Sequence, residues 1–241
     1  MKHTIKLSRR LTNVASFLSP GSLFADIGSD HAYLPCYICL QDNEARAIAG
    51  EINEGPYLSA CKTVESYQLT NVVDVRLGDG LEVLNKNEVT EIVIAGMGGS
   101  LIKSILDDGR DKLLNVKRII VQPNVEEQNV RSWLLSNGFK LTNEIILEEN
   151  NHIYEIIVGD KADEINSSKS TLEEKQLFFG PLLMSNPNPV FYKKWRSEHS
   201  KRAATLEQIK KANTLHKEKI RQFEMELDWI EEVLQNEKKY Y

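Results

Sequence analysis

The chain of 241 residues has no apolar run that approaches the length of a membrane-spanning helix. Residues 1–10 lack the apolar segment that is typical of a signal peptide. There are only three cysteines, which cannot all pair with one another within the chain, and this is typical of proteins from a reducing compartment. From these absences we expect a cytoplasmic protein with no part embedded in a membrane.

Ligand sets for a metal ion are also lacking. Cys36 and Cys39 form a C-x-x-C pattern, but they lie in an apolar segment that is expected to be helical. No second cysteine pair and no His-x-x-His pattern completes a zinc site. We therefore interpret both residues as thiols of the hydrophobic core and expect no metal, with redox or metal chemistry at this pair as the alternative.

The composition predicts a folded chain with two parts. A hydrophobic content of 41% supports a core, and 27% charged residues is close to the average for globular proteins. The length suits one domain of ordinary size with an appendage. Residues 159–170 are mostly polar, so we expect a boundary there, with domains at residues 1–160 and 161–241.

The first part contains a pattern of strand, tight turn and helix. Residues 23–27 form an apolar run that only Asp26 interrupts, and Gly28 follows it. Gly28 permits the sharp turn that must come next, and a helix is predicted to begin near Tyr33, with Pro35 in its first turn. The free backbone N–H groups of such a turn are typical of nucleotide-binding sites.

This turn lacks the second and third glycines of the dinucleotide-binding pattern G-x-G-x-x-G. Asp30 places a carboxylate where a pyrophosphate would have to lie, which favours a ligand with positive charge. S-adenosylmethionine fits, because it carries a sulfonium and an ammonium and has no phosphate. The run Asp26-Ile27-Gly28 also resembles the opening of the first motif of class I methyltransferases, although Asp30 and Ala32 stand where that family has further glycines.

The remaining apolar runs predict the rest of a sheet. Four more parallel strands are expected at residues 45–49, 72–77, 92–95 and 118–121, and an antiparallel pair at residues 143–147 and 152–158. Helices are expected at residues 7–18, 57–68, 126–136 and 172–184. Five βα units followed by a hairpin are the ground plan of class I methyltransferases, so we predict an α/β fold with that Rossmann-like sheet.

Acidic and glycine-rich residues end these strands at the edge where parallel sheets bind ligands. Glu51 lies 23 residues after Gly28, about where an acidic residue holds the ribose hydroxyls of an adenosine ligand. Asp79 follows the third strand and can accept a hydrogen bond from an adenine amino group, and the glycine-rich loop at residues 96–99 allows close approach of a ligand. The predicted cofactor-binding residues are Asp26, Gly28, Ser29, His31, Glu51, Ile52, Gly78, Asp79, Gly80, Gly96, Met97 and Gly98.

The C-terminal part is predicted to be an α-helical hairpin. Apolar residues at positions 220, 223, 227, 230 and 234 form a heptad seam on the second of two long helices, and the first carries a weaker seam. A turn near Asn213 would fold the two helices into an antiparallel coiled coil.

Charge is distributed unevenly along the chain, whose net charge is −5. Residues 1–160 hold 15 Lys and Arg against 22 Asp and Glu, whereas residues 192–211 hold seven basic residues against two acidic ones. Such a basic helix is typical of a surface that contacts phosphates, and a solvated helix face is the alternative. Arg9 and Arg10 lie on the polar side of the first helix, close enough to the turn to reach a ligand or a polyanion.

Several motifs together resemble the bacterial tRNA (adenine(22)-N1)-methyltransferase family. They are Leu7-Ser8-x-Arg10-Leu11, residues 25–35, Asn53-Glu54-Gly55-Pro56, Gly78-Asp79-Gly80-Leu81, residues 95–99 and Gln122-Pro123-Asn124. The likeness covers most of residues 5–160, and the same family has a C-terminal helical hairpin. It implies S-adenosylmethionine as cofactor, tRNA as partner and N1 of adenine 22, in the D-loop region, as methyl acceptor. The RNA-binding residues that we expect are Lys6, Arg9, Arg10, Lys193, Lys194, Lys201 and Arg202.

The chemistry agrees with this resemblance. N1 of adenine is a neutral ring nitrogen with an in-plane lone pair, so it can attack a sulfonium methyl group without losing a proton first. Asp30 is predicted to act in catalysis by stabilising the cationic product, and His31 either orients the base or caps the turn. Enzymes that methylate the exocyclic amine commonly have Asn/Asp-Pro-Pro-aromatic after the fourth strand. The glycine-rich loop at residues 96–99 stands there instead, which leaves Met97 or Tyr33 to cover the base.

Other classes of protein stay open at this stage. A methyltransferase acting on another RNA, or on a small molecule, would share the sheet domain, although a small-molecule enzyme would not need a basic hairpin. A non-catalytic binding protein that uses the hairpin as a coiled-coil contact would tolerate an occluded cofactor site. We expect a monomer.

Overall fold

The computed structural model describes residues 5–162, 172–211 and 217–237. The chain divides into two compact units, Met1–Gly180 and Pro181–Tyr241. The first unit therefore extends past the boundary that we expected at residue 160. The turn predicted near Asn213 lies outside the described residues, as does most of the polar stretch at residues 159–170.

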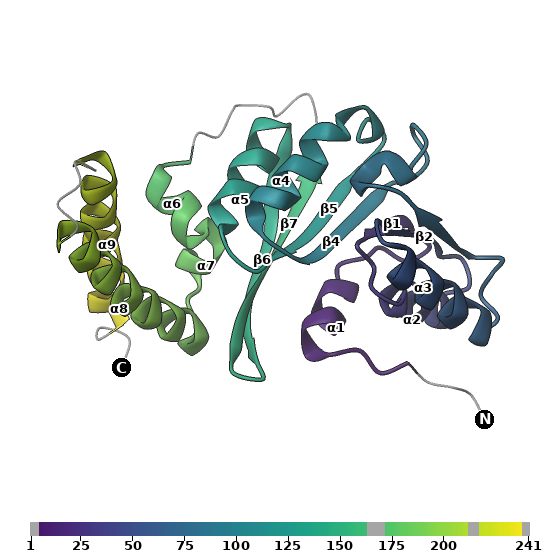
Figure 1. Cartoon of the computed structure of the whole chain (residues 1–241), viewed down its shortest axis with the longest axis horizontal. Coiled ribbons are helices and arrows are strands. Elements are labelled where there is room, and N and C mark those ends of the chain that lie inside the picture. Colours follow the sequence, from purple (N-terminus) through teal and green to yellow (C-terminus); the bar gives the residue numbers. More distant parts are fainter. Residues whose placement is uncertain (1–4, 163–171, 212–216, 238–241) are drawn as a thin grey trace. The chain divides into compact units, whose positions relative to one another are not determined.

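A sheet of seven strands in the order β3-β2-β1-β4-β5-β7-β6 forms the centre of the first unit (Figure 1). The strands are β1 (Leu23–Ile27), β2 (Arg46–Glu51), β3 (Val73–Leu77), β4 (Glu91–Met97), β5 (Arg118–Pro123), β6 (Phe139–Glu149) and β7 (His152–Lys161). Strands β1 to β5 are parallel, and β7 pairs antiparallel with both β5 and β6. The predicted Rossmann-like α/β fold with a terminal antiparallel hairpin is confirmed.

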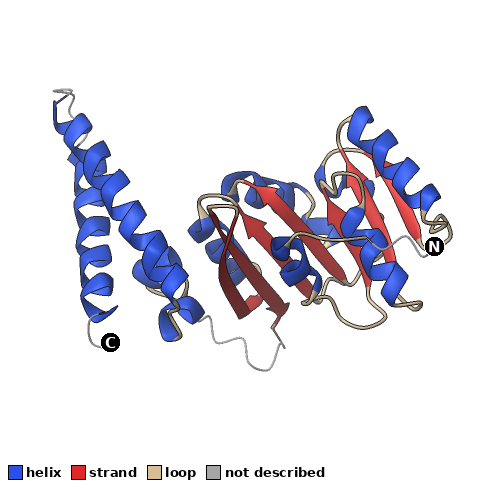
Figure 2. Ribbon diagram, turned by 90° about the horizontal axis from the view of Figure 1, so that it is seen from below, coloured by secondary structure: helices blue, strands red, loops and turns tan. Residues whose placement is uncertain are grey.

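Helices cover both faces of this sheet (Figure 2). They are α1 (Arg9–Ala15), α2 (Tyr33–Gln41), α3 (Glu54–Ser66), α4 (Gly99–Asp108) and α5 (Glu127–Ser136), with short 3₁₀ helices η1 (Gly80–Val83) and η2 (Arg110–Lys112). Successive residues of a strand point to opposite faces. Thus Ile92 and Ile94 of β4 pack with α4 and α5, whereas Val93 packs in a second core with α1, α2 and α3.

The second core also contains the two cysteines of the C-x-x-C pattern. Cys36 and Cys39 are buried free thiols on α2. Burial raises the pKa of Cys36 to about 12 and that of Cys39 to about 11, so neither is a reactive thiolate near neutral pH. In the described ranges no group of three or more His, Cys, Asp or Glu residues could hold a metal ion, and no helix is long and apolar enough to cross a membrane.

A buried ion-pair cluster fixes the end of the first unit. Arg131 of α5 donates through Nε to Glu144 at 2.6 Å and through Nη2 to Glu155, and all three side chains are fully buried. Its Nη1 donates to the carbonyl of Leu177 at 3.0 Å. Leu177 belongs to α6 (Glu174–Phe179), so the cluster ties this helix to α5, β6 and β7.

The single helix that we predicted at residues 172–184 is wrong in its continuity. The structure has α6 and a separate helix α7 (Pro181–Ser185), with Gly180 between them at φ +90°. A Cβ at Gly180 would lie 2.6 Å from Nη2 of Arg131, so the backbone must turn here without a side chain. Pro181 then begins a new helix, as proline readily does.

The second unit contains a pair of long antiparallel helices, α8 (Pro189–Lys211) and α9 (Lys217–Glu237). Trp195 and Leu206 of α8 and Ile230 of α9 are buried. Ion pairs join the two helices, and they include Arg202 with Glu226 at 2.7 Å and Lys210 with Glu224 at 2.8 Å. The predicted helical hairpin is confirmed.

Candidate active site

A pocket of about 320 Å³ lies at the carboxyl ends of β1 and β4. This is the edge at which open parallel sheets bind their ligands. Its lining residues come from α1, from β1 and the turn after it, from the start of α2 and from the end of β4. They are Arg10, Leu11, Asp26, Gly28, Ser29, Asp30, Tyr33, Leu34, Ala95, Gly96 and Met97. Six of the predicted catalytic and cofactor-binding residues therefore line one cavity, together with Arg10.

The turn after β1 has a strained backbone. Asp30, His31 and Ala32 have φ angles of 41°, 61° and 55°, which non-glycine residues rarely adopt. Such a conformation costs of the order of 1–3 kcal/mol per residue and persists only where the surroundings hold it. Here the N–H of Gly28 donates to the carbonyl of Gly50 at 2.9 Å, and the N–H of Asp30 donates to the side chain of Glu51.

Two carboxylates are buried beside this turn. Asp26 is 4% exposed and accepts a hydrogen bond from the Ser29 hydroxyl at 2.7 Å, and Glu51, at the end of β2, is 5% exposed. Burial raises the pKa of Asp26 to about 7, and it also raises the pKa of Glu51. Oε1 of Glu51 is buried and has no hydrogen-bond partner among the described residues. A buried acceptor without a partner is rare and costly, so this oxygen is suited to a donor on a ligand.

The glycine at the start of the turn leaves room for the side chain of Met97. Gly28 has φ +70°, and a Cβ there would collide with the methyl end of Met97. The methyl end of Met97 thus packs against Gly28, and both residues line the pocket. The side chains of Asp30 and His31 are more exposed, at 80% and 44%, and their Oδ1 and Nε2 atoms lie 3.4 Å apart. The ring of His31 is 5.5 Å from that of Tyr33, which is 45% exposed.

A chain of hydrogen bonds crosses the far wall of the pocket. Nη1 of Arg10 donates to the side-chain oxygen of Gln122, whose Nε2 donates to Asn124 at 3.1 Å. Asn124 in turn donates to the carbonyl of Gly96 at 2.8 Å. We had predicted no site role for Gln122, although a polar residue at the end of a buried strand, directly before Pro123 and Asn124, was a signal that could have found it.

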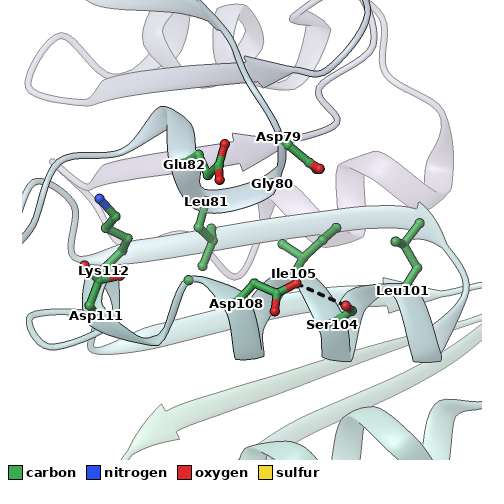
Figure 3. A pocket seen from close by; sticks show the side chains of 11 residues that line it. Asp79, Gly80, Leu81, Glu82, Leu101, Ser104, Ile105, Asp108, Asp111 and Lys112 are labelled. Carbon is green, nitrogen blue, oxygen red and sulfur yellow. Dashed lines mark hydrogen bonds between the residues drawn. The ribbon is translucent and has the colours of Figure 1, made fainter.

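Asp79 and Gly80 do not line this pocket. They lie after β3 and line a second pocket of about 480 Å³ between η1, α4 and η2 (Figure 3). Leu81, Leu101 and Ile105 are its apolar side chains, and Ser104 donates to Asp108 at 3.2 Å beside them. Gly78 directly follows β3, and Ile52, which is 59% exposed, directly follows β2. Both residues therefore lie at the same sheet edge as Asp79. The predicted cofactor residues therefore occupy one sheet edge but two cavities.

The residues expected to bind RNA lie in both units. Lys6 and Arg9 are exposed near the start of α1, whereas Arg10 turns into the pocket. Lys193 and Lys201 are exposed on α8, and Lys201 pairs with Glu198 at 2.9 Å. Lys194 packs its ammonium 5.2 Å from the centre of the Trp195 ring. Arg202 faces α9 and pairs with Glu226, so it does not contribute to an outward basic surface in the way that we expected.

Comparison with known proteins decides the family. The family model described as tRNA (adenine(22)-N(1))-methyltransferase, TrmK, matches residues 24–240. The tRNA (adenine(22)-N(1))-methyltransferase of Bacillus subtilis is 42% identical over 232 residues, which span 95% of this chain and 98% of that protein. The chain belongs to the tRNA (adenine(22)-N(1))-methyltransferase family. The resemblance that the sequence motifs indicated is confirmed.

Solved structures of the TrmK family share the fold over nearly the whole chain. The B. subtilis m1A22 tRNA methyltransferase TrmK aligns with a TM-score of 0.87 and covers 95% of this chain and 99% of that one. A Streptococcus pneumoniae protein in complex with S-adenosyl-L-methionine is 40% identical, with a TM-score of 0.83 and coverage of 95% and 100%. M. capricolum TrmK in complex with S-adenosyl-homocysteine is 28% identical, with a TM-score of 0.78 and coverage of 95% and 98%.

Proposed function

We propose that this chain transfers the methyl group of S-adenosylmethionine to N1 of adenine 22 in tRNA, in the pocket at the carboxyl ends of β1 and β4. The observation that carries this proposal is the pair of buried carboxylates, Asp26 and the partly unpartnered Glu51, beside a strained turn in a chain of the TrmK family. The pocket is not filled by side chains. An enzyme requires such an open cavity, whereas a non-catalytic binding protein would tolerate an occluded one.

The residues of the sheet edge fit the cofactor. Oε1 of Glu51 is a free acceptor for the ribose hydroxyls, and Asp26 offers a negative charge to the ammonium of the methionine tail. Gly28 leaves the start of the turn without a side chain, and Asp79, in the second cavity at the same sheet edge, can accept from the adenine amino group. When bound, S-adenosylmethionine supplies a methyl group on a positively charged sulfur, which makes the methyl carbon electrophilic.

The chain's own residues then need to position the adenine and stabilise charge. N1 attacks with its lone pair, so no residue has to remove a proton first, and in-line placement supplies most of the catalysis. Tyr33 and Met97 line the pocket and are suited to cover the flipped base. Asp30 is 80% exposed, so its charge is well screened until bound tRNA excludes water, and only then would it stabilise the cationic product strongly.

The pH dependence of cofactor binding follows from the buried position of Asp26. Its pKa of about 7 means that the carboxyl is mostly protonated in the free protein below pH 7. Only the ionised form attracts the cofactor's ammonium. The affinity for S-adenosylhomocysteine is therefore expected to rise between pH 5 and pH 7, by up to about tenfold per pH unit, and to level off above pH 7. Calorimetry at several pH values measures this, and an Asp26→Asn variant whose pH profile kept the same slope would assign the titration to another group.

The lysines of α8 are expected to add affinity for tRNA through phosphates. Replacing Lys193, Lys194 and Lys201 by alanine should lower the affinity and flatten its dependence on salt, by about 0.7–0.9 in log–log slope for each phosphate that is no longer neutralised. Arg202 is kept, because its removal would leave Glu226 without this ion pair inside the hairpin. Filter binding across salt concentrations gives the slope, and cofactor affinity serves as the control. An unchanged slope would place the RNA-binding surface elsewhere, with Lys6 and Arg9 as the next candidates.

Methyl transfer to defined transcripts tests the proposed function. The protein and radiolabelled S-adenosylmethionine are incubated with a tRNA that has adenine at position 22 and with the same tRNA carrying guanine there. Guanine N1 carries a proton and has no free lone pair, so we expect label only in the adenine transcript. Equal labelling of both transcripts, or of neither, would refute the proposal.

A further inference from the structure

The end of β4 contains a β-bulge. Ala95 is paired with Gln122 of β5 and Met97 with Pro123, so Gly96 is an extra residue between the two pairs. Gly96 has φ +82°, a value that suits a glycine in such a bulge. An extra residue in a strand changes the face of the sheet on which the next side chain lies. The bulge therefore decides where the side chain of Met97 is placed.

Met97 lies on the face of the sheet that regular alternation would not give it. Ile92 and Ile94 pack in the core with α4 and α5, whereas Val93 packs in the second core. By strict alternation Met97, four positions after Val93, would share the face of Val93. Met97 packs instead against the core of the two isoleucines, and its methyl end lies against Gly28 in the pocket. The bulge thus turns this side chain toward the start of the turn after β1.

Asn124 holds the backbone of the bulge. It donates through Nδ2 to the carbonyl of Gly96 at 2.8 Å and through its backbone N–H to the carbonyl of Met97 at 2.7 Å. Its Oδ1 accepts from Nε2 of Gln122 at 3.1 Å, and Gln122 is 0% exposed. Both ends of the Asn124 amide are therefore engaged within the protein, although the residue itself is exposed. This suits a residue that fixes the bulge.

The loops that follow β4 and β5 are joined further along as well. The N–H of Gly99 donates to the carbonyl of Val125 at 2.8 Å. The N–H and the hydroxyl of Ser100 donate to the carboxylate of Glu126 at 3.2 and 2.5 Å. Glu126 has φ 59°, a conformation that non-glycine residues keep only where the surroundings hold it. The two loops thus form one wall, and Asn124 fixes the bulge to it.

We propose that Asn124 is a positioning residue for methyl transfer, because it keeps Met97 where its side chain can cover the acceptor base. This inference rests on the proposed function, since it assumes that an adenine enters the pocket. The thioether of methionine is polarisable and packs well against an aromatic ring. A misplacement of about 1 Å can slow an enzymatic step about 100-fold, so the place of Met97 should affect the rate of transfer. The carboxylates suited to the cofactor, Asp26 and Glu51, stand on β1 and β2, so cofactor binding should depend little on Asn124.

Two substitutions separate the hydrogen bond from the size of the side chain. Asn124→Ala removes the amide, whereas Asn124→Asp keeps its shape and its acceptor but has no donor for the carbonyl of Gly96. Asn137→Ala is the matched control. Asn137 also donates through Nδ2 to a backbone carbonyl, that of Trp133 at 2.7 Å, but it does so at the carboxyl end of α5. Circular dichroism checks that every variant is folded.

Three measurements are made on the full chain and on each variant. The rate of methyl transfer to the tRNA with adenine at position 22 is measured in a single turnover at saturating S-adenosylmethionine and tRNA. The affinity for S-adenosylhomocysteine is measured by calorimetry. NMR spectra of the chain with isotope-labelled methionine methyl groups report the surroundings of Met97, which is one of four methionines. Met97→Leu identifies its resonance.

Both Asn124 variants are expected to transfer the methyl group about 10- to 100-fold more slowly, with an affinity for S-adenosylhomocysteine within about threefold of the wild type. The Met97 resonance should shift in both variants. Asn137→Ala should change neither the rate nor this resonance.

The other outcomes assign Asn124 a different role. A slower rate with an unchanged Met97 resonance would make Asn124 a direct contact to the tRNA. Equal losses of rate and of cofactor affinity would mean that it only supports the fold of the pocket. Either result, or an unchanged rate, overturns the inference. A wild-type chain that did not methylate this tRNA would instead overturn the proposed function itself.

Discussion

Replacing Arg131 by methionine is expected to lower the free energy of unfolding by about 3–5 kcal/mol. The side chains of Arg131, Glu144 and Glu155 are all fully buried, so the variant leaves two carboxylates in the interior without their cation. The carbonyl of Leu177 loses its donor as well. Urea denaturation followed by circular dichroism measures the decrease in stability.

A second variant shows whether the charge is the cause. A triple variant with Arg131→Met, Glu144→Leu and Glu155→Leu removes the whole ionic cluster and should recover much of the stability. A single variant that was destabilised by less than about 1 kcal/mol at pH 7 would show that this cluster does not fasten α6 to the sheet domain.

Replacing Glu51 by leucine is expected to weaken S-adenosylmethionine binding about 10- to 100-fold, because the ribose hydroxyls lose a charged acceptor. The free protein should hardly lose stability. Oε1 of Glu51 is buried without a partner among the described residues, so its removal offsets the loss of the hydrogen bond from the N–H of Asp30. We expect a change of less than about 1 kcal/mol in the free energy of unfolding without cofactor.

Glu91 is a matched control for Glu51. It is also 5% exposed, but it lies at the amino end of β4, and its carboxylate accepts a hydrogen bond from the N–H of Ser19 at 3.2 Å. Glu91→Leu should therefore cost about 1–3 kcal/mol of stability and leave cofactor affinity unchanged. If both variants lost stability and affinity in parallel, the effect at Glu51 would be structural and the residue would not be a cofactor ligand.

The strands of the fold could be predicted well because parallel strands are buried on both faces. Such strands appear as continuous apolar runs, and the run at residues 23–27 coincides with β1. The hairpin strands are longer than predicted, because β6 lies at the edge of the sheet and mixes buried with exposed residues. Helix α4 was not predicted. It begins at Gly99, where a Cβ would collide with the carbonyl of Glu126, so packing requires a glycine that weakens the helical pattern.

Only those parts of the site that stand at the end of a predicted strand could be predicted from the sequence. Asp26 lies near the end of an apolar run, and Glu51 and the loop at residues 96–99 follow such runs, so their place at the carboxyl edge was inferred from the chain order. The left-handed backbone at residues 30–32 could not be inferred from the chain order. Interactions with Gly50 and Glu51 hold this backbone, and the types of residues 30–32 do not favour it. The hydrogen bond of Arg10 with Gln122 joins residues 112 positions apart, and amphipathic periodicity places Arg10 only on the polar side of a helix.

The identity of the methylated atom tests the central claim most directly. A tRNA with adenine at position 22 is treated with the protein and S-adenosylmethionine, digested to nucleosides at neutral pH and analysed by mass spectrometry against N1- and N6-methyladenosine standards. Attack by the ring nitrogen, in a site that lacks the Asn/Asp-Pro-Pro-aromatic motif for gripping the amine, predicts N1-methyladenosine as the product, confined to the fragment that contains position 22. N6-methyladenosine as the product, or a methyl group at another position of the tRNA, would contradict the account.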